Sequence, residues 1–243
     1  MEVNGARIVY QNDWFLLSGS VVTTWIVMAV ITLLCIFLTR NLKVHATSRR
    51  QIIAEFLVKS ANNLVRANMG ERFSSYAPLA ASVLAISVCC SLSSLLGAFP
   101  PTGDLSTTLG WALVIFTLIT YWKIKSGGIG KYLKGYLDPI PVMLPINIIG
   151  EVMTPVSMAF RHYGNIASGM IISMLVYSAL AGLSATVLGA IPGVAGKILS
   201  GVPIFQVGIP AILSIYFDLF SSGIQAFIFC TLMMVNIKLA AEG

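Results

Sequence analysis

Five long apolar segments, separated by short polar stretches, make up most of the chain. Segments 14–39, 78–99 and 107–122 are close to the length of about 20 residues with which a helix crosses the hydrocarbon core of a bilayer. Segments 140–191 and 204–240 are longer than one upright crossing requires, so we expect both helices to be strongly tilted or bent. The pattern predicts an all-α integral membrane protein with five membrane crossings.

Proline and glycine mark the breaks between these segments. The pair Pro100 and Pro101 ends the second segment, and the stretch 191–203 begins with Ile-Pro-Gly and ends with Gly-Val-Pro. Two long helices joined through that one stretch suggest a tilted hairpin. Pro155 lies inside the first of them, and because proline removes a backbone hydrogen bond we expect a kink there.

Basic residues gather in two clusters, after the first and after the third apolar segment. Because an excess of Lys and Arg marks the cytoplasmic side, both clusters predict an N-terminus outside and a C-terminus in the cytoplasm. Apolar residues at helical spacing accompany the first cluster in 40–77, which is typical of a helix in the membrane interface or, as we prefer, of an amphipathic connector. The glycines at 127–130 predict a flexible turn in the second cluster. The clusters are Arg40, Lys43, Arg49, Arg50, Lys59, Arg66 and Arg72, and Lys123, Lys125, Lys131 and Lys134.

Composition supports a lipid environment, since 57% of the residues are hydrophobic and only 10% are charged, with a mean hydropathy of +0.88. The net charge of +6 does not indicate nucleic-acid binding, because the basic residues lie between apolar segments. The four cysteines lie inside apolar segments without the spacing of a metal site, so we expect neither a metal nor a disulfide. Met1–Asp13 lacks the features of a signal peptide, and the first segment is therefore expected to remain as a membrane anchor.

A few polar residues lie within the two long segments, and Arg161 is the most informative of them. Placing a guanidinium at bilayer depth costs from about 3 to about 15 kcal/mol, so it needs an acidic partner or a wet cavity. Ser157 and Asn165, four residues before and after it, share its helix face. Asp218 and Gln225 form a second stripe in the last segment. Either Arg161 and Asp218 form a salt bridge that ties two helices together, or Asp218 handles a proton or an ion.

Three sequence motifs resemble those of one known family. The run at 155–169 reads Pro-Val-Ser-Met-Ala-Phe-Arg-His-Tyr-Gly-Asn-Ile-Ala-Ser-Gly, the run at 225–229 reads Gln-Ala-Phe-Ile-Phe, and the loop at 101–108 reads Pro-Thr-Gly-Asp-Leu-Ser-Thr-Thr. In this order they resemble the a subunit of the F-type rotary ATP synthases, the stator subunit that faces the rotating c-ring. The resemblance covers most of the chain from about residue 78 onward.

The resemblance implies a mechanism of ion translocation. Two half-channels would reach the middle of the membrane from opposite sides, and a carboxylate on each c subunit would collect an ion from one and release it into the other. Arg161 would stand between them, favour the ionised carboxylate and repel any cation leaking straight across. Gln225 would lie opposite Arg161 and hold it by a hydrogen bond. The two long C-terminal helices would form the hairpin against the c-ring.

The resemblance also assigns polar residues to the half-channels. Asn165 and Ser157 would line the cytoplasmic one, whereas Asp218 and Asp104 would line the outer one. Relatives carry His or Glu where this chain has Asp218, so the shorter Asp is a departure from the family's pattern. For Asp104, capping of the following helix is an equal alternative.

Two polar residues near Arg161 receive no role from the resemblance. His162 points about 100° around the helix from Arg161, so packing or a hydrogen bond is the expected role of its side chain. Glu151 lies ten residues before Arg161 at a different angle around the helix, and the sequence does not decide its role.

The resemblance implies a non-catalytic subunit without a cofactor, whose partners are the c-ring, the b subunits, the other ATP synthase subunits and the lipid bilayer. The translocated ion is H⁺ or Na⁺, and the sequence does not distinguish them. Lys-rich cytoplasmic loops favour a bacterial plasma membrane over an organelle inner membrane.

Two other function classes were considered. An intramembrane aspartyl enzyme would use Asp104 and Asp218 as a pair, but the Gly-x-Gly-Asp motif of such enzymes is absent and Asp104 lies in a loop. A stand-alone secondary transporter is the nearer alternative, although five crossings without repeated halves are unusual for one.

Overall fold

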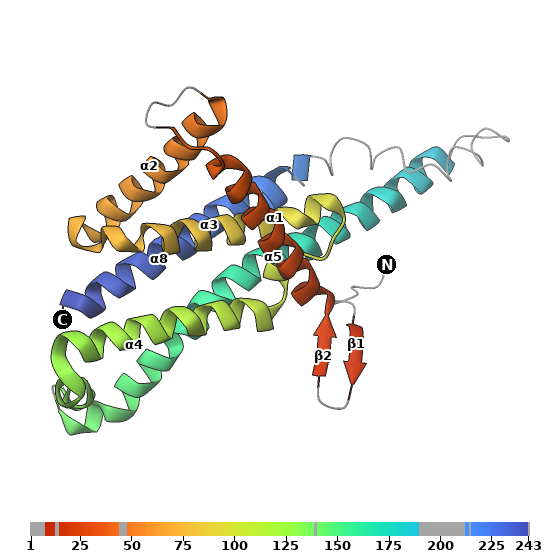
Figure 1. The fold of residues 1–243 in the computed structure, drawn as a ribbon. Helices are drawn as coiled ribbons and strands as arrows, with labels where there is room; N and C mark the ends of the chain where they lie inside the picture. Colours follow the sequence, from red (N-terminus) through yellow and green to blue (C-terminus); the bar gives the residue numbers. More distant parts are fainter. Residues whose placement is uncertain are drawn as a thin grey trace.

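The computed structural model describes residues 8–12, 15–43, 48–138, 140–189, 212–213 and 215–242. Its helices form an elongated bundle in which α3 and α8 lie side by side and α4 crosses α5 (Figure 1). Within the described residues, five helical stretches are long and apolar enough to cross a membrane, in agreement with the predicted number. The helices that form them are α1 (Gly19–Thr39), α3 (Ala77–Leu92), α4 (Leu105–Gly135), α5 (Leu144–Gly189) and α8 (Ser222–Glu242), the last preceded by a π-helical turn (Ile215–Ser221).

A small β-hairpin precedes the first helix. Strand β1 (Ile8–Asn12) pairs antiparallel with β2 (Phe15–Ser18), and α1 begins directly afterwards at Gly19. The sequence pattern indicated only a polar start followed by a helix from residue 14, so the hairpin is an addition to the predicted all-α architecture.

The segment between the first two crossings contains the amphipathic helix α2 (Arg49–Met69). Ile52 and Phe56 are exposed on one face of this helix, whereas Val65 and Met69 are buried against the bundle. The guanidinium of Arg50 lies 4.3 Å from the ring centre of Phe37, which links α2 to the end of α1. The connector predicted for 40–77 is therefore a helix packed along one face.

Helix α4 is longer than its apolar stretch. It reaches Gly135 as two helical pieces that meet at a kink at Gly128, inside the stretch 127–130 where a turn was expected. Only Gly128 departs from helical geometry, with a φ of 76° that L side chains rarely adopt. The second lysine cluster is therefore carried on helix, on both sides of a break at Gly128.

Helix α5 spans 46 residues, and Pro155 lies inside it without ending it. The helix packs against α4 and α8. Among the 18 most apolar consecutive residues of this crossing, only 6% are buried within the bundle. The corresponding fraction is 50% for the crossing that contains α8. Exposed apolar side chains are stable in lipid, so α5 presents most of its surface to the bilayer or to a partner.

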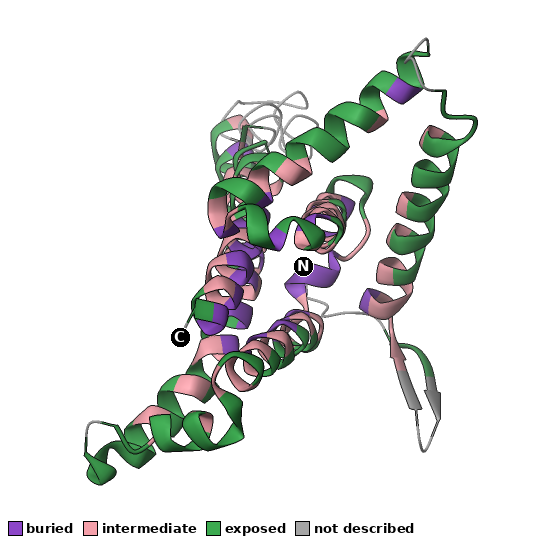
Figure 2. Cartoon of the chain, turned by 60° about the vertical axis from the view of Figure 1, so that its left-hand side comes forward, coloured by how far each residue is buried: buried purple, intermediate pink, exposed green. Residues whose placement is uncertain are grey.

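The core lies where α3, α4, α5 and α8 meet. Figure 2 shows the buried positions gathered where the helices cross and exposed positions dominating the outlying helices. Helix α8 supplies the largest share of buried side chains. The sulfur of Cys230 donates to the carbonyl of Ala80 at 3.4 Å, and all four cysteines are free thiols. The buried residues of α8 include Phe229, Cys230, Met233, Met234 and Ile237.

Candidate functional site

Arg161 lies on the exposed face of α5. Among the described residues its guanidinium forms no hydrogen bond and no ion pair, and in particular none with Asp218. The neighbouring Phe160 is 52% exposed, and Ser157, one turn earlier, is exposed as well. A permanent positive charge therefore stands on an apolar outer surface, which requires a partner that this part of the chain does not supply.

Asn165 has turned away from that outer face toward the start of α8. Its side-chain amide donates to the carbonyl of Ser221 at 3.2 Å, and the Ser221 hydroxyl donates back to Asn165 Oδ1 at 2.8 Å. Of the predicted stripe, Ser157 and Arg161 thus face outward while Asn165 fastens α5 to α8.

The π-helical turn before α8 carries Asp218, which is half-buried. Single π-helical turns are rare and are often found at functional sites. Gly169 on α5 lets this turn approach closely, because a Cβ built there would lie 3.2 Å from Cβ of Phe217. The close approach and the Asn165–Ser221 pair together fix the position of the turn against α5.

His162, next to Arg161, points into the core and is fully buried. Its Nε2 lies 3.1 Å from the hydroxyl of Ser87 on α3. The imidazole also packs between Trp111 on α4 and Phe229 on α8, with ring centres 6.1 and 5.1 Å away. The expected packing and hydrogen bonding of this residue are both present, whereas its Nδ1 has no partner among the described residues.

Gln225 is buried in α8, with 7% of the residue exposed, and its Nε2 has no hydrogen-bond partner among the described residues. It lies one turn from Ser221, which contacts Asn165, and one turn from Phe229, which contacts His162. Gln225 therefore lies at the level of the Arg161 turn. The expected hydrogen bond between Gln225 and Arg161 is absent from this structure.

Asp104 stands at the start of α4 and joins it to α1. Its Oδ1 accepts the backbone N–H of Ser106 at 3.0 Å, which is a helix N-cap, and its Oδ2 accepts the hydroxyl of Ser20 at 2.8 Å. Thr102, in the same loop, lies 3.1 Å from the buried hydroxyl of Ser91. The capping alternative is thus present in the structure, and the carboxylate is only partly buried.

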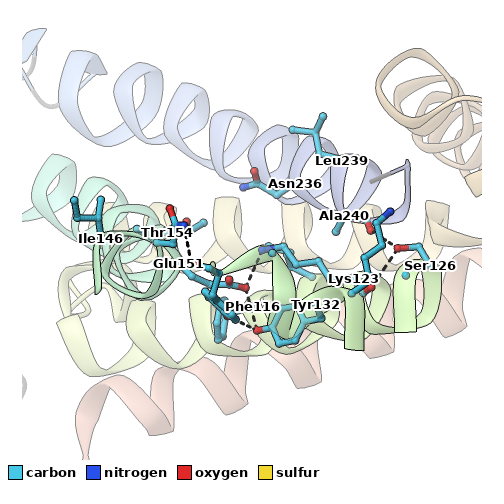
Figure 3. Close-up of a pocket in the computed structure, with 17 residues that line it drawn as sticks. Phe116, Lys123, Ser126, Tyr132, Ile146, Glu151, Thr154, Asn236, Leu239 and Ala240 are labelled. Atoms are coloured by element: carbon cyan, nitrogen blue, oxygen red, sulfur yellow. Dashed lines mark hydrogen bonds and ion pairs between the residues drawn. The ribbon is translucent and has the colours of Figure 1, made fainter. Parts of the chain in front are cut away.

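A cavity of about 690 Å³ lies between α4, the beginning of α5 and the end of α8 (Figure 3). Lys123 on α4 donates to Glu151 on α5 at 2.8 Å, and the hydroxyl of Tyr132 donates to the same carboxylate oxygen at 3.3 Å. Tyr136 lies beside this carboxylate, and burial together with the hydrogen bonding to Glu151 raises the pKa of its phenol above the ordinary value.

The sequence left Glu151 undecided and did not single out this cavity. Lys123 and Glu151 are 28 residues apart, so no spacing rule links them. The one available signal was a single acidic residue in an apolar segment that follows a lysine cluster. On α5, Asn147 and Thr154 also line the cavity, seven residues apart and therefore on one face.

Known proteins match this chain along nearly its whole length. A family model described as ATP synthase A chain matches residues 21–238. The ATP synthase subunit a 1 of Crocosphaera subtropica is 32% identical over 243 residues, covering 98% of this chain and 93% of that protein. Subunit a 2 of Acaryochloris marina is 31% identical over 237 residues, covering 97% and 90%, and subunit a of Desulforamulus reducens is 28% identical over 238 residues, covering 94% and 83%.

Proposed function

This chain belongs to the ATP synthase A chain family, and from that premise we propose how its polar residues move an ion. As subunit a it is a multi-pass, non-catalytic subunit of the membrane sector, and it forms the ion channel of the stator. The finer proposal concerns which residues meet the ion and which meet the moving partner.

We propose that Arg161 faces a carboxylate carried on each subunit of a c-ring. The observation that carries this proposal is the exposed guanidinium, which has no partner among the described residues of its own chain. A fixed positive charge stabilises the ionised form of a passing carboxylate and so drives out its bound H⁺ or Na⁺. The same charge repels a free cation, which prevents a leak between the two half-channels.

Asp218 and Asp104 are proposed to line the outer half-channel. Both carboxylates are only partly buried, and they lie at the outer ends of α8 and α4 in the proposed orientation. The contact between Asp104 and Ser20 places α1 beside the same entrance.

Ser157 is proposed to line the cytoplasmic half-channel, with the cavity around Glu151 as its mouth. Asn165 is proposed to line its inner end, beyond Arg161, where its side chain now binds Ser221. The cavity is lined by Lys123 and Lys131 from the basic cluster that we assign to the cytoplasmic side. Thr154, on its wall, lies within about 20° of Arg161 around the axis of α5, given 100° per residue. One helix face would therefore lead from the mouth toward Arg161.

Gln225 is proposed to turn toward Arg161 in the assembled complex, where its Oε1 would accept a hydrogen bond from the guanidinium. In support, its buried Nε2 has no hydrogen-bond partner among the described residues, and the side chain lies at the level of the Arg161 turn. The amide would hold the guanidinium whenever no ring carboxylate is opposite.

The two basic clusters support an N-terminus outside and a C-terminus in the cytoplasm, and the bacterial relatives support a bacterial plasma membrane as the location. The proposed partners are the c-ring, which α5 and α8 would face, and the b subunits.

The test is Arg161→Ala in the complete ATP synthase, reconstituted into lipid vesicles. We expect loss of both ion-driven ATP synthesis and ATP-driven pumping, because no other described residue places a free cation at that level of α5. Arg66→Ala is the matched control, since Arg66 is exposed on α2 and pairs only with the exposed Glu71. Normal coupling in Arg161→Ala would refute the assignment.

A further inference from the structure

Two polar contacts hold α5 in the turn that begins at Arg161. Asn165 binds Ser221 at the start of α8, and His162 binds Ser87 on α3. Between transmembrane helices, apolar contacts fix the rotation of a helix weakly, because lipid is equally apolar. Near Arg161 the rotation of α5 is therefore set by these two contacts and by the packing around them, while the pair of Glu151 with Lys123 holds the beginning of the helix.

The imidazole of His162 determines where Arg161 points. Adjacent residues of an α-helix are separated by about 100° around its axis. An imidazole held inward against α3 therefore keeps the side chain of Arg161 away from the core. His162 is fully buried while Arg161 is exposed, as this geometry requires. Turning α5 by one residue would bring the guanidinium into the apolar core and the imidazole into the lipid.

One side chain connects α5 to three other helices. The Nε2 of His162 reaches Ser87 on α3, and its ring packs on Trp111 of α4 and Phe229 of α8. Ser87 is itself fully buried, and among the described residues its hydroxyl bonds to this imidazole. Losing either partner would leave the other polar group buried without this hydrogen bond, which is unfavourable.

We propose that His162 is the positioning residue of Arg161. By binding Ser87 it sets the rotation of α5 that keeps the guanidinium on the outer face, where a ring carboxylate can reach it. This inference rests on the proposed function of Arg161 and adds to it a residue that touches neither the ion nor the ring.

The experiment uses the complete ATP synthase in lipid vesicles with three variants. His162→Leu removes the polar contact, Ser87→Ala removes its partner, and His162→Gln keeps a polar group close to the place of Nε2. Ser94→Ala is the control, because Ser94 follows α3 seven residues after Ser87 and its hydroxyl bonds to the carbonyl of Ser91, three residues away in sequence, and not to another helix among the described residues.

Two quantities are measured, the amount of assembled complex and the ions pumped per ATP hydrolysed by that complex. We expect pumping per ATP to fall about tenfold in His162→Leu and in Ser87→Ala, the change that corresponds to about 1.4 kcal/mol. His162→Gln should recover most of the pumping, and Ser94→Ala should match the wild type. The uncoupled variants should also leak ions through the membrane sector, because Arg161 no longer blocks the direct path.

A purely structural role gives a different result, in which assembly falls but each assembled complex pumps normally, and that result overturns the proposal. If His162→Leu does not assemble, Ser87→Ala and His162→Gln decide by the same criteria. Arg161→Ala is run in parallel. Pumping in Arg161→Ala would refute the proposed function itself, whereas an inactive Arg161→Ala beside normally pumping His162→Leu and Ser87→Ala would refute only the positioning role.

Discussion

The ion pair between Lys123 and Glu151 gives a quantitative prediction, because the two residues are exposed to different degrees. Their charged atoms lie 2.8 Å apart, and the side chains are 38% and 11% exposed. At an effective dielectric constant of about 20 the gross attraction is about 6 kcal/mol. The cost of desolvating Glu151 and the partial exposure of Lys123 offset most of it, so we expect a net coupling of about 2 kcal/mol.

The perturbation is a double-mutant cycle made of Lys123→Met, Glu151→Gln and the combined variant. Lys123→Met should cost the most, because it leaves the Glu151 carboxylate in the cavity beside the neutral phenols of Tyr132 and Tyr136, without a compensating positive charge. Glu151→Gln should cost less, since Lys123 can turn toward water. The combined variant should recover about 2 kcal/mol relative to the sum of the two single changes, which is roughly a 30-fold change in an equilibrium constant.

The assay is unfolding of the detergent-solubilised complex by a graded denaturant, followed by protease sensitivity of this chain. The pair Lys125→Met and Asp138→Asn serves as a control, because no ion pair joins these residues. Strictly additive costs for Lys123→Met and Glu151→Gln would show that the two charges are not coupled, and the reasoning from distance and exposure would then be wrong.

Two further predictions concern the turn before α8. Asp218→Asn should slow ion flux more than it lowers complex yield, with Asp138→Asn as the exposed control; unchanged flux per complex would reduce Asp218 to a structural residue. Gly169→Val should destabilise the complex by about 1–3 kcal/mol through overpacking against Phe217. In Gly164→Val a Cβ meets nothing within 4 Å, so the loss should be smaller, and equal melting shifts in the two variants would contradict the close approach.

Hydropathy predicted the crossings well because lipid imposes one strong requirement, a run of apolar residues of sufficient length. It marked only the apolar part of α4, to residue 122. The chain does kink at Gly128, inside the stretch 127–130 where a turn was expected, and a further helical piece then continues to Gly135. The strands Ile8–Asn12 and Phe15–Ser18 were missed because a two-stranded hairpin is too short to establish a clear alternating pattern.

The candidate site was likewise predictable from the sequence only in part. Arg161 could be singled out because a charge at membrane depth is costly whichever way that face of the helix points. The inward contacts could not be predicted, because His162 and Ser87 are 75 residues apart and their meeting depends on how three helices pack. Asn165 shares a helical face with Arg161 by spacing, yet it turns to Ser221, since the i, i+4 rule fixes the side of a helix and not the choice of a hydrogen-bond partner.

The exposed apolar surface of α5 has a mechanical consequence for a rotating partner. Next to Arg161 and onward along α5 this surface includes side chains such as Phe160, Ile172 and Leu175, whose exposed fractions are 52%, 41% and 61%. Contacts of this kind are non-directional and individually weak, so a ring that slides past them breaks no hydrogen bonds and meets little friction. Facing the proposed ring, the guanidinium would be the one exposed charge on the described part of α5, and it would divide smooth rotation into steps of one ring subunit.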